Sequence, residues 1–310
     1  MAKTPSAMDQ ILDVVEEKDE ALIETFKKNS QEGEAFICFI APYVGVRISP
    51  SKYISASIGL SEEFGTETVI DKIREILEVT DPTEKISKVY LLLNSPGGLV
   101  HSSYKVAKAL RKSFKEITVF VVHMAASGGT LIALAGNEII MGTMSQLSPL
   151  DPSSNSISAL SVVRSFQTVT SFLSTIQEGD IPYSYKSIAN KFTAEKIDRA
   201  QSVLELMKKY ASEILTESGY DDTATENISE RLVEGCLDHS EVIDYDTAKD
   251  IGLKVSSNSK YIDLWGAFRD WLNEYLLAAA DKHVIRYWVN HEKKKEKKSS
   301  EEKGKKENSK

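Results

Sequence analysis

The stretch VFVVHMAASGGTLIALAGNEIIMGTMSQLSPLDP, residues 119–152, decides the fold. Its first four residues are apolar and indicate a buried strand. Small residues at 125–129 lead into an apolar helix predicted over residues 130–135, and a second strand is predicted over residues 138–141. A serine between a buried strand and a helix start lies beside unpaired helix N–H groups, which suit a negatively charged oxygen. We therefore interpret Ser127 as the candidate nucleophile.

A similar strand and turn lie just upstream. The sequence predicts a buried strand over residues 88–93, a turn at Asn-Ser-Pro-Gly-Gly (residues 94–98) and a helix over residues 100–112. Two glycines after a proline let the backbone turn and present its N–H groups. If the two strands are adjacent and parallel, the tips of the two turns meet.

These tips are the predicted oxyanion hole, the site that stabilises negative charge on a reacting carbonyl oxygen. Backbone N–H groups can bind such an oxygen. The candidate donors are the N–H of Gly98, together with that of Gly97, and the N–H of Gly128. The glycines also permit tight turns, and we expect them to serve both purposes.

The two motifs resemble a known family. Asn-Ser-Pro-Gly-Gly followed by Ala-Ala-Ser-Gly-Gly is similar to the ClpP/signal-peptide-peptidase-A superfamily of serine peptidases. The longer match over residues 86–152, with a weaker one over residues 236–253, most resembles the serine dehydrogenase proteinase family. This resemblance implies an α/β fold, a ClpP/crotonase-like spiral of β-β-α units with additional C-terminal helices, and a homo-oligomer. Strands that alternate with helices and are mostly apolar throughout favour the same fold class.

A serine hydroxyl is a poor nucleophile unless a base takes its proton. In ClpP-type enzymes a histidine base follows the second strand, and the equivalent place here, residues 148–152, contains no histidine. The serine dehydrogenase proteinase family is described with the order Ser, Asp, His, which this sequence meets with Ser127, Asp151 and His239. On this resemblance His239 is the base, and Asp151 orients it and stabilises its protonated form.

Other bases stay open. His123 lies four residues before Ser127 and either reaches the site or bonds in the core, while His101 begins the helix after the Gly-Gly turn. Without the resemblance, His239 is a surface residue and Asp151 belongs to a common Asp-Pro turn. A Ser–Lys dyad is known in the superfamily, and the candidate lysines are Lys186, Lys191 and Lys196. The remaining histidines, interpreted as surface groups, are His283 and His291.

Composition bounds the class of protein. Of the 310 residues, 41% are hydrophobic and 27% charged, as in ordinary globular proteins, and the net charge of −8 argues against a nucleic-acid partner. The two cysteines, Cys38 and Cys236, fit a reducing compartment. The sequence has no signal-peptide pattern, no long apolar window, no phosphate-loop motif and no Cys/His cluster with metal-ligand spacing. We therefore expect a cytoplasmic protein without cofactor or metal.

Four regions are expected. Residues 1–34 form a helical arm, which contacts a partner subunit or packs on its own domain, and residues 35–256 form the peptidase domain. Residues 257–290 form an amphipathic helix that contains all three tryptophans. It packs on the domain in the favoured interpretation, and contacts a membrane surface or another protein in the alternative. Residues 291–310 form a disordered tail of net charge +4, so the first 290 residues carry −12.

Three functions compete. The first is a serine peptidase that cleaves peptide or protein substrates through an acyl-enzyme on Ser127. The second is an oligomeric scaffold without catalysis, which the absence of a histidine near Leu150 motivates. The third is crotonase-type chemistry on acyl-CoA thioesters, which uses a similar oxyanion hole. It ranks last because it has no need of the Ala-Ala-Ser-Gly-Gly motif.

Overall fold

A six-stranded, mostly parallel sheet forms the centre of the protein. The computed structural model describes residues 19–41, 46–49, 52–54, 58–154, 157–177, 182–279 and 284–291. The strands lie in the order β11 (Val255–Ser257), β7 (Glu138–Met141), β5 (Phe114–Val121), β4 (Ile86–Asn94), β1 (Ala35–Ile40) and β12 (Val284–Val289). Only the β1–β12 pair in this sheet is antiparallel. The predicted α/β class is therefore confirmed.

Both faces of the sheet are covered, which explains the unbroken apolar runs of its strands. Along β1, Ile37 and Phe39 face one core cluster, whereas Phe36, Cys38 and Ile40 face the other, and all are buried. Because successive side chains of a strand point to opposite faces, a strand buried on both sides shows no polar alternation.

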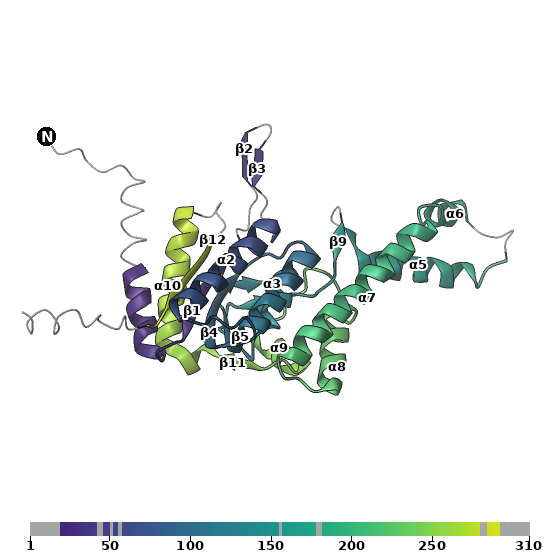
Figure 1. The fold of residues 1–310 in the computed structure, drawn as a ribbon. Helices are drawn as coiled ribbons and strands as arrows, with labels where there is room; N and C mark the ends of the chain where they lie inside the picture. The colour runs from purple at the N-terminus through teal and green to yellow at the C-terminus, as the bar shows by residue number, and fades with distance from the viewer. Residues whose placement is uncertain are drawn as a thin grey trace, which may run out of the picture.

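Different helices cover the two faces (Figure 1). The first face packs against α2 (Leu60–Ile76), α3 (Val100–Ser113), α4 (Gly128–Ala133), α7 (Ala194–Glu217) and α8 (Asp222–Val233). The second packs against a helix over residues 19–29 and against α10 (Ile262–Ala279). Leu22 and Phe26 of the first of these helices are buried, as are Phe268 and Trp271 of α10. Both helices therefore pack on their own domain.

A helical arm that is separate from the one expected over residues 1–34 extends away from the sheet (Figure 1). It contains α5 (Ala159–Leu173), α6 (Tyr183–Ala189) and the N-terminal part of α7. The C-terminal half of α7 joins the arm to α3, because the Tyr104 and Tyr210 rings stack with centroids 3.8 Å apart and Lys108 pairs with Glu213 and Glu217. The smaller elements are β2 (Val46–Ser49), β3 (Lys52–Ile54), β6 (Met124–Ala125), β8 (Gln146–Leu147), β9 (Ser153–Ser154), β10 (Ile157–Ser158), α9 (Tyr245–Ile251) and η2 (Asn258–Tyr261).

One sequence-based expectation needs correction. The helix predicted to run to residue 290 ends at Ala279, and Val284–Val289 is instead β12, paired with β1. In β12 the Trp288 ring stacks on the Phe36 ring of β1 with centroids 5.0 Å apart. The apolar residues of this segment therefore pack as an edge strand of the sheet. Between β1 and α2 the described chain forms the β2–β3 hairpin and, at Ile58, a parallel bridge to Gly98. The described residues that follow Pro152 form β9, β10 and the start of α5.

The expected disordered tail (from residue 292 on) and most of the expected N-terminal arm lie outside the described residues. Within the described part of the chain, no helix combines the length and apolarity that a membrane crossing requires.

Candidate functional site

The two glycine-rich turns meet, as the sequence predicted. β4 and β5 are adjacent and parallel, and just beyond them the Ser95 N–H donates to Met124 O (2.9 Å) while the Ala126 N–H donates to Ser95 O (2.9 Å). Gly97, with φ +102°, lies against the second turn. A Cβ atom there would be 2.8 Å from both Ala126 O and the Cβ of Ser127, so only glycine fits this contact.

Ser127 occupies the sharp turn between β6 and α4 and is half-buried. Its backbone angles, φ 48° and ψ −113°, lie in a region that residues other than glycine rarely adopt. Two hydrogen bonds hold it there: its N–H donates to Ser148 Oγ (2.8 Å), and its carbonyl accepts from the Leu131 N–H (3.1 Å). Strain of this kind persists only where the surrounding structure enforces it, and it is common at active sites. Its Oγ makes no hydrogen bond within the described residues.

Two backbone N–H groups beside Ser127 have no acceptor within the described chain. The backbone of Ile58 bonds to the two chain neighbours of Gly98. Its N–H donates to Gly97 O (2.8 Å), and its carbonyl accepts from the Leu99 N–H (2.9 Å). In such a parallel bridge the N–H of Gly98 itself points away from Ile58. The N–H of Gly128, at the start of α4, is likewise unbonded, and a Cβ atom on Gly128 would lie 3.2 Å from Gly98 N.

The N–H of Gly97 differs from these two. It donates to Ser95 Oγ (3.1 Å), a contact inside the turn. Of the three predicted donors, Gly98 and Gly128 are therefore available to a ligand, and Gly97 acts through its close approach to Ser127.

Residues that the sequence interpretation did not single out support this arrangement. The buried carboxylate of Glu62 accepts from the Gly59 N–H (2.7 Å) and so fixes the residue next to Ile58. Thr130 Oγ1 accepts from the Ser148 N–H (3.1 Å) and has Ala125 O (2.7 Å) and Ser148 O (2.8 Å) as alternative acceptors for its proton, which ties α4 to the segment that follows β8. The Glu62 contact follows a capping pattern that begins with Gly59 instead of the usual Ser or Thr, so the sequence signal was weak.

Asp151 and His239 occupy neighbouring segments. Asp151 is buried, and its Oδ1 accepts from the Leu160 N–H (3.1 Å). Burial raises the pKa of the Cys236 thiol, and the nearby Asp151 carboxylate raises this pKa further, so Asp151 lies near the segment that carries His239. His239 is half-buried, and its Nδ1 is buried without a partner in the described residues.

Backbone contacts hold the end of α8 and the His239 segment that follows it, residues 234–244, against the segment that follows Ser127 in the chain. The Leu150 N–H donates to Leu232 O (2.8 Å), and Leu147 and Ile243 exchange two hydrogen bonds of 2.8 and 3.0 Å. Ser127, Asp151 and His239 thus lie on segments that meet along residues 147–151. Among the described contacts, no hydrogen bond joins the three side chains to one another, and the catalytic relay stays a prediction.

The alternative bases lie in other surroundings. His123 Nε2 is 2.7 Å from Asn273 Oδ1 on α10, the helix that covers the second face of the sheet. His101 is exposed beside Glu63, whose pKa is lowered chiefly by the neighbouring hydroxyl of Ser102 and slightly by His101. The three candidate lysines, all exposed on or near the helical arm, are Lys186, Lys191 and Lys196. Of the two remaining histidines, His291 Nδ1 lies 3.9 Å from Glu32 Oε1, and His283 is outside the described residues.

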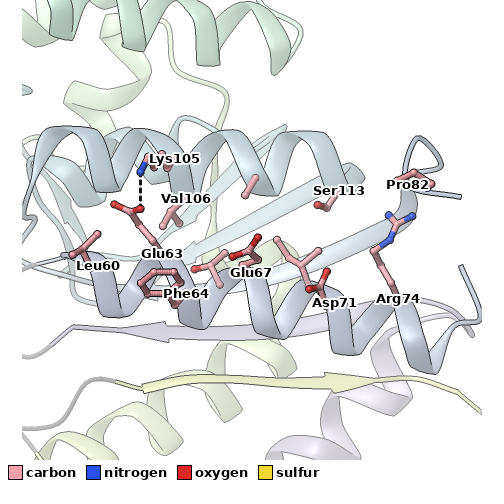
Figure 2. A pocket seen from close by; sticks show the side chains of 13 residues that line it. Leu60, Glu63, Phe64, Glu67, Asp71, Arg74, Pro82, Lys105, Val106 and Ser113 are labelled. Atoms are coloured by element: carbon pink, nitrogen blue, oxygen red, sulfur yellow. Dashed lines mark hydrogen bonds and ion pairs between the residues drawn. The ribbon is translucent and has the colours of Figure 1, made fainter. Parts of the chain in front are cut away.

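A hollow of about 590 Å³ lies between α2 and α3 (Figure 2). The exposed side chains of Leu60 and Phe64 line it together with Glu63, which pairs with Lys105 across the two helices at 2.9 Å. None of the predicted catalytic or oxyanion residues lines this hollow. No group of three or more His, Cys, Asp or Glu side chains in the described ranges is placed to hold a metal ion.

The chain is similar in sequence to a known protein family and to two proteins of an archaeon. A sequence profile of ClpP-like SDH-type serine proteinases matches residues 66–301. Two proteins of Methanocaldococcus jannaschii, uncharacterized protein MJ0137 and uncharacterized protein MJ1495, are 31% and 27% identical to the chain over 189 residues. Each match covers 61% of this chain, and it spans 60% and 59% of the two relatives, less than two thirds of their length.

The chain is also similar to a solved structure, that of a mutant of the 1510-N membrane-bound stomatin-specific protease. The two are 17% identical with a TM-score of 0.40, and the match covers 72% of this chain and 80% of the other.

Proposed function

The chain belongs to the family of ClpP-like SDH-type serine proteinases, and on that premise we propose that it hydrolyses peptide bonds through an acyl-enzyme on Ser127. One observation carries the proposal: a serine in a strained turn lies beside two backbone N–H groups, of Gly98 and Gly128, that have no acceptor in the described chain. A nucleophile next to unused donors is the arrangement that acyl transfer requires.

In the proposed reaction Ser127 Oγ attacks the peptide carbonyl carbon, and the carbonyl oxygen becomes an anion held by the N–H groups of Gly98 and Gly128. One such donor typically contributes about 2.7–4 kcal/mol of transition-state stabilisation. His239 takes the Ser127 proton and gives it to the leaving amine, and a water molecule then hydrolyses the ester on Ser127. The buried Nδ1 of His239 needs a partner, and Asp151 supplies it in this proposal.

Labelling with a fluorophosphonate, followed by mass spectrometry to locate the adduct, tests this function. Wild type should be labelled at Ser127, Ser127→Ala should not be labelled, and His239→Ala should be labelled far more slowly because Ser127 has lost its base. His123→Ala and His101→Ala serve as matched controls and should keep the wild-type rate. A folded wild-type protein that is never labelled would instead favour the non-catalytic scaffold, which the unbonded Ser127 Oγ also permits.

The partners of the site belong to the same proposal. We propose peptide or protein substrates and a homo-oligomer, in line with the family, and sedimentation of the full chain tests the oligomer. Contact with a membrane surface or another protein through the C-terminal helix and tail is the alternative role for that region. In the described part of α10 the Phe268 and Trp271 side chains are buried and cannot make such a contact without rearrangement.

A further inference from the structure

The buried hydroxyl of Ser103 has no hydrogen-bond partner in the described residues and lies beside Gly128, near the N–H of Gly98. Ser103, in the first turns of α3, has no exposed surface, and its Oγ has no hydrogen-bond partner within the described residues. A helical serine commonly satisfies its hydroxyl on the carbonyl four residues earlier, but here the Leu99 carbonyl accepts the Ser103 N–H (3.0 Å) and not its hydroxyl. Buried hydroxyls without partners are rare and costly, so this one calls for an explanation.

The position of the hydroxyl supplies one. A Cβ atom built on Gly128 would lie 2.2 Å from Ser103 Oγ and 3.2 Å from Gly98 N. The Ser103 hydroxyl and the Gly98 N–H therefore face the same small volume on one side of Gly128. This volume adjoins the two donors assigned to the oxyanion, and only a residue without a side chain at position 128 leaves room there for the Ser103 hydroxyl.

We propose that Ser103 Oγ is a third hydrogen-bond donor to the oxyanion, and this rests on the proposed function of Ser127. In the resting protein the hydroxyl has no acceptor. When Ser127 attacks a carbonyl, the oxygen beside Gly98 and Gly128 gains negative charge and becomes a strong acceptor. An interaction that forms only in the transition state lowers the barrier without strengthening substrate binding.

Ser102, the neighbour of Ser103 on α3, provides a matched control. It is equally buried and its hydroxyl likewise has no hydrogen-bond partner in the described residues, but this hydroxyl lies beside Glu63 of α2, whose pKa it lowers. Figure 2 shows Glu63 on this side of α3, in contact with Lys105. Ser102→Ala therefore removes a buried hydroxyl from the same helix turn without removing one from the volume beside Gly128.

The test compares the second-order rate constant of fluorophosphonate labelling at Ser127 in four full-length proteins: wild type, Ser103→Ala, Ser103→Thr and Ser102→Ala. The phosphoryl oxygen of this probe takes the place of the oxyanion. We expect Ser103→Ala to react about 10²-fold more slowly, as for loss of one oxyanion donor. Ser103→Thr keeps the hydroxyl and should recover most of the rate, and Ser102→Ala should match wild type.

Hydrolysis of a p-nitrophenyl ester supplies the second readout. In Ser103→Ala we expect kcat to fall with KM unchanged, because the lost interaction belongs to the transition state. If Ser103→Ala does not fold, Ser103→Cys replaces it, since a thiol occupies similar space but donates weakly. Wild-type rates in a folded Ala or Cys variant would overturn the inference alone. Absence of labelling in wild type would remove the proposed function and, with it, this inference.

Discussion

The pair of glycine turns and the segment over residues 234–244 differ in how they are held, although the proposed chemistry needs both. The turns follow buried parallel strands, and backbone hydrogen bonds fix them at Ser95, Ile58 and Ser127. The His239 segment is largely exposed between its backbone anchors, and an ion pair between Arg231 and Glu241 closes it. The fold itself thus fixes the nucleophile and the oxyanion donors, whereas between its backbone anchors the segment of the proposed base depends on a side-chain ion pair. The two regions should therefore respond differently to substitution.

The largest effect is expected from Gly98→Ala. The added Cβ atom would lie 2.2 Å from Ile58 N and 2.4 Å from Ile58 O, and these backbone atoms cannot rotate away. The turn must shift, which moves the Gly98 N–H away from the oxyanion. Fluorophosphonate labelling of Ser127 should fall by about 10²-fold or more, and the free energy of unfolding by about 1–3 kcal/mol.

Gly266→Ala is the control for this substitution, because nothing lies within 4 Å of the Cβ atom it adds to α10. It should leave labelling unchanged and stabilise the helix slightly. A Gly98→Ala protein that is labelled at the wild-type rate would show that the fold does not fix this donor, and the contrast between the two regions would fail.

An intermediate effect is expected from Glu241→Gln, which breaks the pair with Arg231 and also weakens the bond from the Leu237 N–H (2.8 Å). The His239 segment should loosen, and labelling should fall by about fivefold, the cost of one lost ion-pair contact of about 1 kcal/mol. Glu75→Gln, which breaks the exposed pair with Lys72 on α2, should change nothing. Equal labelling in the two variants would mean that the ion pair does not position the base.

Lowering the pH should weaken the same contact between Glu241 and Arg231, because it protonates the Glu241 carboxylate. Burial acts to raise the pKa of Glu241, but hydrogen bonds from Arg231 and the Leu237 N–H prevail and leave it below its ordinary value. A carboxyl group with a lowered folded-state pKa stabilises the protein above its unfolded pKa, about 4.3 for Glu, and loses that contribution as the pH falls through the folded pKa. The stability difference between wild type and Glu241→Gln, measured by urea unfolding, should therefore be constant near neutral pH and shrink below about pH 4.

The same contrast explains what the sequence could predict. β1, β4, β5 and β7 follow from apolar runs, and the meeting of the two turns follows from adjacent parallel strands. The local sequence pattern is therefore enough to predict the strands and the two turns, whose geometry is fixed by backbone hydrogen bonds. The unused N–H groups of Gly98 and Gly128 also follow from these turns, although the Ser95 contact that occupies Gly97 does not.

Contacts between distant segments could not be predicted in this way. The aromatic and apolar residues of Val284–Val289 suit the end of a helix as well as a strand, and only the edge of β1 selects the strand. Ser148, the acceptor for the Ser127 N–H, and Ser103 carry no local signal, because their roles arise from neighbours in space. The position of His239 likewise depends on anchors at Leu147 and Leu150, far away in sequence.

The smallest expected effect concerns the strain at Ser127. In the described part of the chain only Ser127 (φ 48°) and Glu78 (φ 55°) adopt positive φ without being glycine. Ser127→Gly should relieve this strain and raise the free energy of unfolding by about 1 kcal/mol, whereas Ser127→Ala keeps the strain and should leave stability nearly unchanged. Both variants should lose labelling. Glu78→Gly, at an exposed helix end, should gain similar stability with labelling intact. If Ser127→Gly is no more stable than Ser127→Ala, the turn stores no strain at the nucleophile.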